Sequence, residues 1–144
     1  MIEGDTIKLL RECDAGIKMG VSSIDDALKY VKSSELKGIL EVCMKEHEDI
    51  KERLQKLLDE YHDDGKEPPV MAKSMSWIKT NFKLAVNESD GEVASLMTDG
   101  CNMGVKSLSK YLNQYKAADE KSKGIAKELI ELEENLAVDV RGYL

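Results

Sequence analysis

The sequence contains few aromatic residues, little proline and no long apolar run. Aromatic residues make up 5% of the 144 residues, and the two prolines stand together at positions 68 and 69. No apolar run approaches the roughly 20 residues that a membrane-spanning helix needs. The opening residues, MIEGDTIKLLRECD, carry scattered charges and lack the apolar centre of a signal peptide. We therefore expect a soluble, cytoplasmic protein.

Cysteine is also scarce. Cys13, Cys43 and Cys101 are odd in number and far apart, and none belongs to a C-x-x-C pair. This favours a reduced, cytosolic setting over a disulfide framework. Cys43 and Cys101 are expected to be small core residues. Cys13 flanks the apolar stripe of its helix and is expected to be half exposed.

Basic residues are fewer than acidic residues. The chain has 28 acidic and 21 basic residues, and its net charge is −7. A surface of this sign repels nucleic acid and anionic membranes, and no basic stripe offsets the repulsion. We expect neither as a partner. Charged residues at 34%, together with frequent leucine, lysine, glutamate and alanine, are typical of a soluble helical protein.

Helical periodicity is what the sequence has in abundance. Apolar residues recur in alternating steps of three and four, which places them along one face of a helix. Breaks in the pattern fall at KSSELKG, HDDGKEPP, NESDGE and YKAADEKSKG. A length of 144 residues favours a single domain over residues 1–144. Its helices are expected at about 6–31, 35–62, 70–86, 90–116 and 120–142.

Several polar residues predict where these helices begin and end. Asp5 is expected to be the N-cap of the first helix and Ser33 or Ser34 that of the second, because their side-chain oxygens accept hydrogen bonds from free N–H groups. Ser89 opens the sequence SDGE, which has the spacing of a capping box. Gly65 is expected to take the left-handed conformation that ends the second helix.

The expected helix at 70–86 determines the topology. Its 17 residues reach ~25 Å at ~1.5 Å per residue, a large part of the length of the bundle. The chain can therefore return to near the start of the second helix, so that the third long helix runs parallel to the second. Two hairpins joined by such a crossover form the ferritin-like connection.

A faint internal repeat supports two related hairpins. MGVSSIDDALKY at 19–30 is similar to MGVKSLSKYLNQ at 103–114, an offset of 84 residues. KGI at 37–39 recurs at 123–125, an offset of 86. The first hairpin thus matches the second, helix for helix.

Four segments carry a resemblance to a known class of proteins. They are, in order, LLRECDAGIKMG, GKEPP, SMSWIKTNFKLAV and SDGEVASLMTDGCNMGVKSLSKYLNQY. In this order and spacing the chain resembles, over nearly its whole length, a bacterial ferritin-like family of uncharacterised function. The resemblance implies an all-α four-helix bundle with a long crossover that contains an additional short helix. It implies no established reaction.

The residues of a di-iron centre are incomplete. Di-iron proteins of the ferritin-like class take a glutamate from each of two helices and a Glu-x-x-His motif from each of the other two. Here Met44 stands three residues before His47, and the last helix has no histidine. The inward position on the first helix is Asp14, and the third helix offers Gly100 and Cys101. We do not expect a complete di-iron site.

His47 is the main candidate site residue, because it lies within an apolar stripe. Glu133 is its counterpart at an offset of 86, and helix rise places both near the middle of the bundle. We expect a buried polar pair in which one hydrogen bond satisfies both side chains, with no cofactor. The alternative is a single metal ion held by His47, Glu133 and Asp14.

These features predict a non-catalytic bundle with a structural or partner-binding role, for which a homodimer is one arrangement. The alternative is a redox or storage protein of the ferritin-like class that binds iron, manganese or zinc. Histidine phosphotransfer is disfavoured, because the stripe places His47 inside and HEDIKERL contains no glycine. Neither histidine lies in a hydrolase nucleophile motif, so enzymatic activity is not expected.

Overall fold

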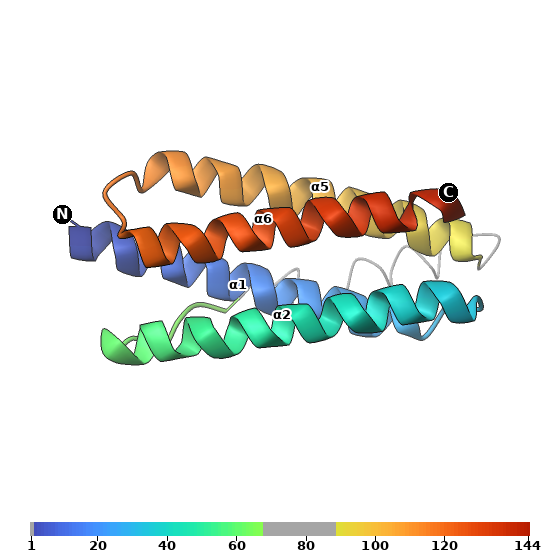
Figure 1. The fold of residues 1–144 in the computed structure, drawn as a ribbon, viewed down its shortest axis with the longest axis horizontal. Helices are drawn as coiled ribbons and strands as arrows, with labels where there is room; N and C mark the ends of the chain where they lie inside the picture. The colour runs from blue at the N-terminus through green and yellow to red at the C-terminus, as the bar shows by residue number, and fades with distance from the viewer. Residues whose placement is uncertain (1, 68–88) are drawn as a thin grey trace.

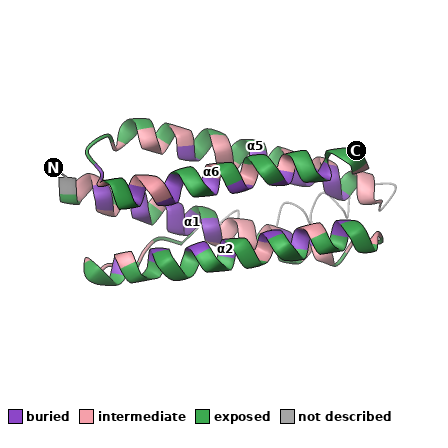
Figure 2. Cartoon of the chain, viewed as in Figure 1, coloured by how far each residue is buried: buried purple, intermediate pink, exposed green. Residues whose placement is uncertain are grey.

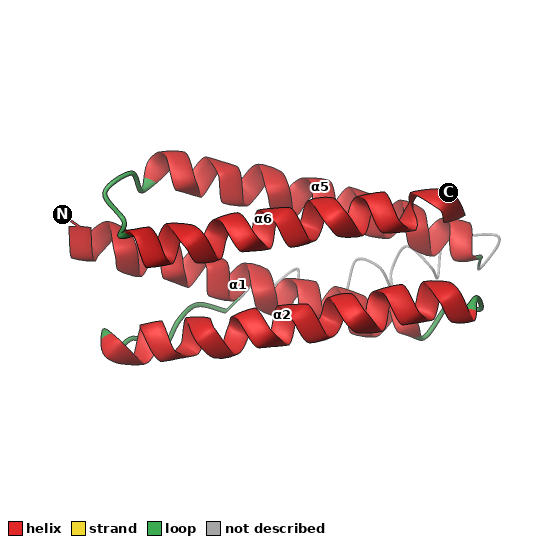
Figure 3. Cartoon of the chain, viewed as in Figure 1, coloured by secondary structure: helices red, strands yellow, loops and turns green. Residues whose placement is uncertain are grey.

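The computed structural model describes residues 2–67 and 89–144, which form long helices joined by short turns (Figure 1 and Figure 3). The helices are α1 (Ile2–Leu28), α2 (Ser34–Glu60), α5 (Asp90–Gln114) and α6 (Glu120–Val140), followed by the 3-10 turn η1 (Arg141–Tyr143). No strand occurs within these ranges. For the residues that the structure describes, the prediction of an all-helical bundle with four long helices is confirmed. The helix predicted at 70–86 lies outside the described residues.

The helices form two antiparallel hairpins, α1 with α2 and α5 with α6 (Figure 1). Asp90, the first residue of α5, accepts hydrogen bonds from the backbone N–H groups of Lys32 (2.8 Å) and Ser33 (3.0 Å). The start of α5 therefore lies beside the α1–α2 turn. As a result α5 runs parallel to α2, the direction that the sequence predicted (Figure 1).

The opposite end of the bundle is held in a similar way. Thr6 Oγ1 accepts a hydrogen bond of 2.8 Å from the backbone N–H of Asp119, and Asp5 accepts one of 3.0 Å from that of Ala117. The prediction that Asp5 caps α1 is wrong, because α1 begins at Ile2 and Asp5 lies in its first turn. A carboxylate there still favours the helix dipole.

The serine caps are as predicted. The Ser33 hydroxyl accepts a hydrogen bond of 3.3 Å from the backbone N–H of Leu36, and the Ser89 hydroxyl accepts one of 3.3 Å from Glu92. Both serines have extended backbone, as N-caps require. These caps fix the starts of α2 and α5 at the same end of the bundle.

The end of α2 differs from the prediction. His62, rather than Gly65, follows the helix with a left-handed φ of 53°. The N–H of His62 donates to Asp59 O (3.1 Å) and that of Asp63 to Leu58 O (3.0 Å), a Schellman motif. Gly65 is also left-handed, with a φ of 83°, but it lies beyond the motif.

The core lies along the facing stripes of the four helices (Figure 2). Cys13 is fully buried, so the prediction that it is half exposed is wrong. The physical reason is that α1 packs against α2, α5 and α6 at once, which buries a wider face than one stripe. None of the described helices has the length and apolar character of a membrane span.

Candidate functional site

His47 occupies the centre of the buried stripe of α2. Steps of four and three residues place the stripe on one face of the helix. The side chain of His47 is 1% exposed, and it is one of the few buried polar side chains among the described residues. The stripe consists of Leu36, Leu40, Cys43, His47, Ile50, Leu54 and Leu58.

Both ring nitrogens of His47 face oxygen acceptors. Nδ1 lies 2.8 Å from the backbone oxygen of Cys43, one turn earlier on α2. Nε2 lies 2.9 Å from Oε1 of Glu133 on α6. A carbonyl oxygen can only accept, so Nδ1 carries a proton and donates it. A second proton lies between Nε2 and the Glu133 carboxylate, because two acceptors cannot share a hydrogen bond.

The charge of this His47–Glu133 pair follows from the balance of two effects. Burial lowers the pKa of His47, because a charged imidazolium loses its hydration. A hydrogen bond to the side chain of Cys43, whose sulfur lies 3.6 Å from Nδ1, a hydrogen bond to Glu133 and the negative charge of Glu133 outweigh burial and raise this pKa to about 10. The His47 imidazole is therefore protonated at neutral pH and faces Glu133. A metal ion at either ring nitrogen would have to displace a proton that is directed at an oxygen acceptor.

Two glycines pack against the pair. A Cβ added to Gly20 on α1 would lie 2.9 Å from Nε2 and 3.0 Å from Cδ2 of His47. A Cβ added to Gly104 on α5 would lie 3.5 Å from the Glu133 side chain. The pair thus takes one charged group from each hairpin and one glycine from each hairpin.

Residue chemistry alone does not single out these two glycines, but the internal repeat contains a signal for them. Gly20 and Gly104 are equivalent positions of the internal repeat, at the offset of 84. His47 and Glu133 are equivalent at the offset of 86. The structure therefore gives the repeat a physical meaning, since each hairpin supplies a glycine on one helix and a charged residue on the next.

Cys101 on α5 lies beside the pair and stays protonated. It is 1% exposed. Burial raises the pKa of its thiol, and the charge of Glu133 and a hydrogen bond to that carboxylate raise it further. A neutral thiol can donate to Glu133, but it is a poor nucleophile and a poor metal ligand. Cys43 is buried as well, so both cysteines lie in the core.

A hollow of about 320 Å³ between α1 and α5 reaches the Glu133 side chain. Its walls include Gly20 and Gly104, whose missing side chains widen it, and the thioethers of Met19 and Met103. The Glu133 side chain is 14% exposed, against 1% for that of His47. Solvent therefore reaches the carboxylate from this side, while the imidazolium stays enclosed.

Asp14 does not join the pair. This residue of α1 is 1% exposed. It lies 2.9 Å from Lys18 Nζ and accepts a 3.0 Å hydrogen bond from the backbone N–H of Lys66. Six residues, or ~9 Å of helix rise, separate Asp14 from the glycine that touches His47. Its role in the structure is to hold the chain that follows α2 against α1.

The structure therefore brings together two of the three predicted site residues. Within the described ranges, no group of three or more histidine, cysteine, aspartate or glutamate side chains is arranged to hold a metal ion. Over the described part of the chain, the fold and site define a bundle of four long helices with a buried His47–Glu133 pair between its two hairpins. No family model, curated protein or solved structure matches the chain.

Proposed function

We propose that the protein is a non-catalytic, partner-binding bundle of the ferritin-like type, in which the His47–Glu133 pair takes the central place that di-iron proteins of this class give to metal. The observation that supports this proposal is the contact of both His47 ring nitrogens with oxygen acceptors. A histidine ligates a metal through an unprotonated nitrogen. Here Nδ1 and Nε2 both face oxygen acceptors, so a metal ion would have to displace a hydrogen-bonded proton.

The donor set around the pair also fits iron poorly. A pair of irons in this class is held by four carboxylates and two histidines. Here one carboxylate and one histidine meet, and they neutralise each other. Cys101 adds a protonated thiol, because burial and Glu133 raise its pKa. The residues present do not fit a di-iron centre, and we derive no reaction through one.

The fold supports the ferritin-like part of the proposal. The parallel course of α2 and α5 is the arrangement that a long crossover between two hairpins produces. The net charge of −7 argues against nucleic acid and anionic membranes as partners and leaves proteins as the favoured class. A reducing, cytoplasmic setting belongs to the same proposal, because Cys13, Cys43 and Cys101 are all buried free thiols.

The test is the metal content of untagged protein purified without chelator. After incubation with Fe²⁺, Mn²⁺ or Zn²⁺ and desalting, we expect far less than one ion per chain. The ring ¹⁵N shifts of His47 should show two protonated nitrogens at pH 7, and neither shift should respond to the ions.

A redox or storage role is the rival that the same experiment detects. One ion per chain, retained in His62→Gln and lost in His47→Leu, would overturn the proposal. His62 is the matched control, because it is the other histidine of the chain and is exposed beyond the end of α2.

A further inference from the structure

A long groove runs between α2 and α6, which pack against each other. It begins as a hollow of about 560 Å³ near Gly38 and Asp139. At Glu46, Leu132 and Asn135 it continues into a second hollow of about 290 Å³, which ends near Arg53. We call this surface the α2–α6 groove. It is separate from the hollow that reaches Glu133.

The first part of the groove exposes apolar side chains from both helices. Val42 on α2 is 59% exposed and Val138 on α6 is 55% exposed, and both line the same hollow. Buried Leu132 and Leu136 form its floor. The hollow thus presents two exposed valines over an apolar floor, against which an apolar side chain of another molecule can pack.

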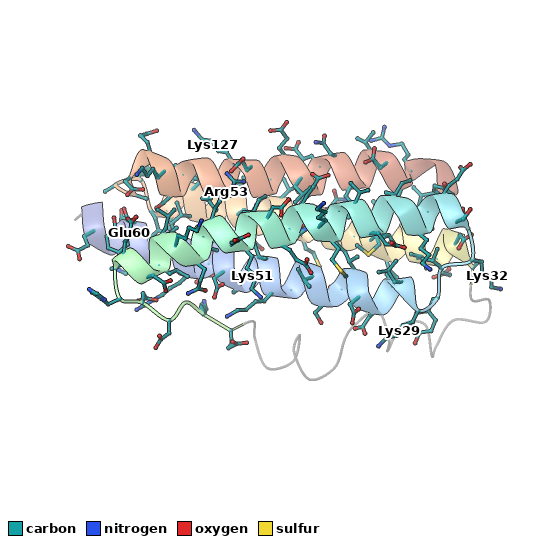
Figure 4. The ribbon with its side chains drawn as sticks, turned by 60° about the horizontal axis from the view of Figure 1, so that its bottom comes forward. Lys29, Lys32, Lys51, Arg53, Glu60 and Lys127 are labelled. Atoms are coloured by element: carbon teal, nitrogen blue, oxygen red, sulfur yellow. The ribbon has the colours of Figure 1, made fainter. Side chains whose placement is uncertain are left out.

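The rim of the groove is acidic. Its carboxylates come from both helices, and the one basic residue among the lining residues, Arg53, pairs with Glu128 at 2.9 Å. Figure 4 shows Arg53 between the two helices, whereas Lys51 and Lys127 point away from the groove. The lining therefore carries a net charge of −4, more than half of the −7 of the whole chain. The carboxylates are Glu46, Asp49, Glu128, Glu131 and Asp139.

Gly38 lies at the mouth of the groove. A Cβ added there would meet no atom within 4 Å. Glycine inside a helix costs about 1 kcal/mol relative to alanine, and no contact with the described residues requires it here, as is also the case at Gly16 and Gly124. The absent side chain leaves room for the backbone of another molecule to approach α2 closely.

We propose that the α2–α6 groove binds a basic amphipathic helix of a partner protein. Such a helix would lay apolar residues at i, i+3 or i+4, and i+7 over Val42 and Val138, as in helix-in-groove recognition. Its lysines and arginines would reach the acidic rim on both sides. From Gly38 to Arg53 the groove is ~22 Å long, which matches a helix of about 15 residues.

A second copy of the chain fits this surface less well. A symmetric dimer through the groove would bring two acidic rims together, and like charges facing each other are unfavourable. This inference names the partner class within the proposed partner-binding function and rests on that function.

The test uses a synthetic helix of about 15 residues, made of leucine at i, i+3 and i+7 spacing and lysine elsewhere. Its binding to the ¹⁵N-labelled protein is followed by NMR and by fluorescence anisotropy at 50 and 300 mM NaCl. We expect shift changes confined to residues 38–53 and 128–139. The affinity should fall at the higher salt concentration, because the rim contacts are exposed and screened.

Charge reversal separates recognition by the groove from general attraction to an acidic protein. Glu46→Lys/Asp139→Lys changes two rim carboxylates, and Glu48→Lys/Glu134→Lys changes two exposed carboxylates outside the lining. The two double variants have the same net charge. We expect the first to raise Kd about tenfold and the second less than threefold. Gly38→Leu should weaken binding similarly while circular dichroism stays unchanged.

Three results would overturn the inference. They are absence of peptide binding, equal loss of affinity in the two double variants, and sedimentation that shows a dimer disrupted by Val42→Asp. The proposed function fails in a different experiment, since metal bound at His47 would remove that proposal and leave binding at the α2–α6 groove unchanged.

Discussion

The contact between Gly20 and His47 predicts that two equivalent substitutions have opposite effects on the free energy of unfolding. Gly20→Ala should lower it, whereas Gly104→Ala should raise it. An alanine Cβ at position 20 would lie 2.9 Å from Nε2 of His47, closer than real Cβ contacts come. The imidazole ring is buried and held by two hydrogen bonds, so it cannot move without breaking one. At Gly104 the nearest contact would be 3.5 Å, an ordinary van der Waals distance.

The magnitudes follow from three effects. Replacing glycine by alanine in a helix gains ~1 kcal/mol at either position. At Gly20, overpacking costs ~1–3 kcal/mol. The weakened hydrogen bond to a buried charge costs a further ~1.5–3 kcal/mol. Gly20→Ala should therefore lower the free energy of unfolding by about 2 kcal/mol or more, and Gly104→Ala should raise it by up to ~1 kcal/mol.

The assay is urea unfolding at pH 7, followed by far-ultraviolet circular dichroism. Gly16→Ala is the matched control on the same helix, because a Cβ there meets no atom within 4 Å. It should stabilise the protein by up to ~1 kcal/mol. If Gly20→Ala were as stable as Gly16→Ala, with the ring signals of His47 unchanged, the reasoning about this contact would be wrong.

Three further predictions concern charge and backbone strain. The pKa of His47 is raised from 6.5 to about 10, so its protonation stabilises the fold fully below pH 6.5. That stability is lost as pH rises toward about 10, by up to ~1.4 kcal/mol per pH unit, and thermal unfolding of His47→Gln should lack this slope. His62→Gly should raise the unfolding free energy by ~1 kcal/mol, because the left-handed φ of 53° suits glycine, whereas urea unfolding of His62→Ala should show no gain. Asp14→Asn should lower the unfolding free energy by ~1–3 kcal/mol, because it removes the buried carboxylate that pairs with Lys18. In a double-mutant cycle, adding Lys18→Met should recover part of this loss.

The helices and the central pair could be predicted from the sequence because they depend on periodicity. The apolar stripe of α2 places His47 in the core, whichever helices pack against α2. The offset of the repeat then selects Glu133 as its counterpart. Predicted and observed helix bounds differ by at most four residues. The largest difference is at the start of α1, which begins at Ile2 and not at residue 6. The sequence MIEG contains no residue that prevents a helix from starting this early.

What could not be predicted depends on contacts between helices. The place of Asp14 follows from the path of the chain after α2, which brings the Lys66 N–H to it, and no local pattern contains that path. Cys13 is buried because three helices surround α1. The role of Gly20 needs the His47 ring in place, since glycine in a helix has no distinctive signal of its own.

The hydrogen bond between His47 and Glu133 also selects how the two hairpins are aligned along the bundle axis. Apolar stripes alone tolerate sliding by one helical turn, ~5.4 Å, because leucine meets leucine again. Such a slip would carry the imidazolium of His47 away from Glu133 and leave an uncompensated charge among aliphatic side chains. Removing one partner of a buried pair costs ~3–5 kcal/mol. One polar contact in an apolar core thus favours a single register of the two hairpins over registers shifted by one helical turn.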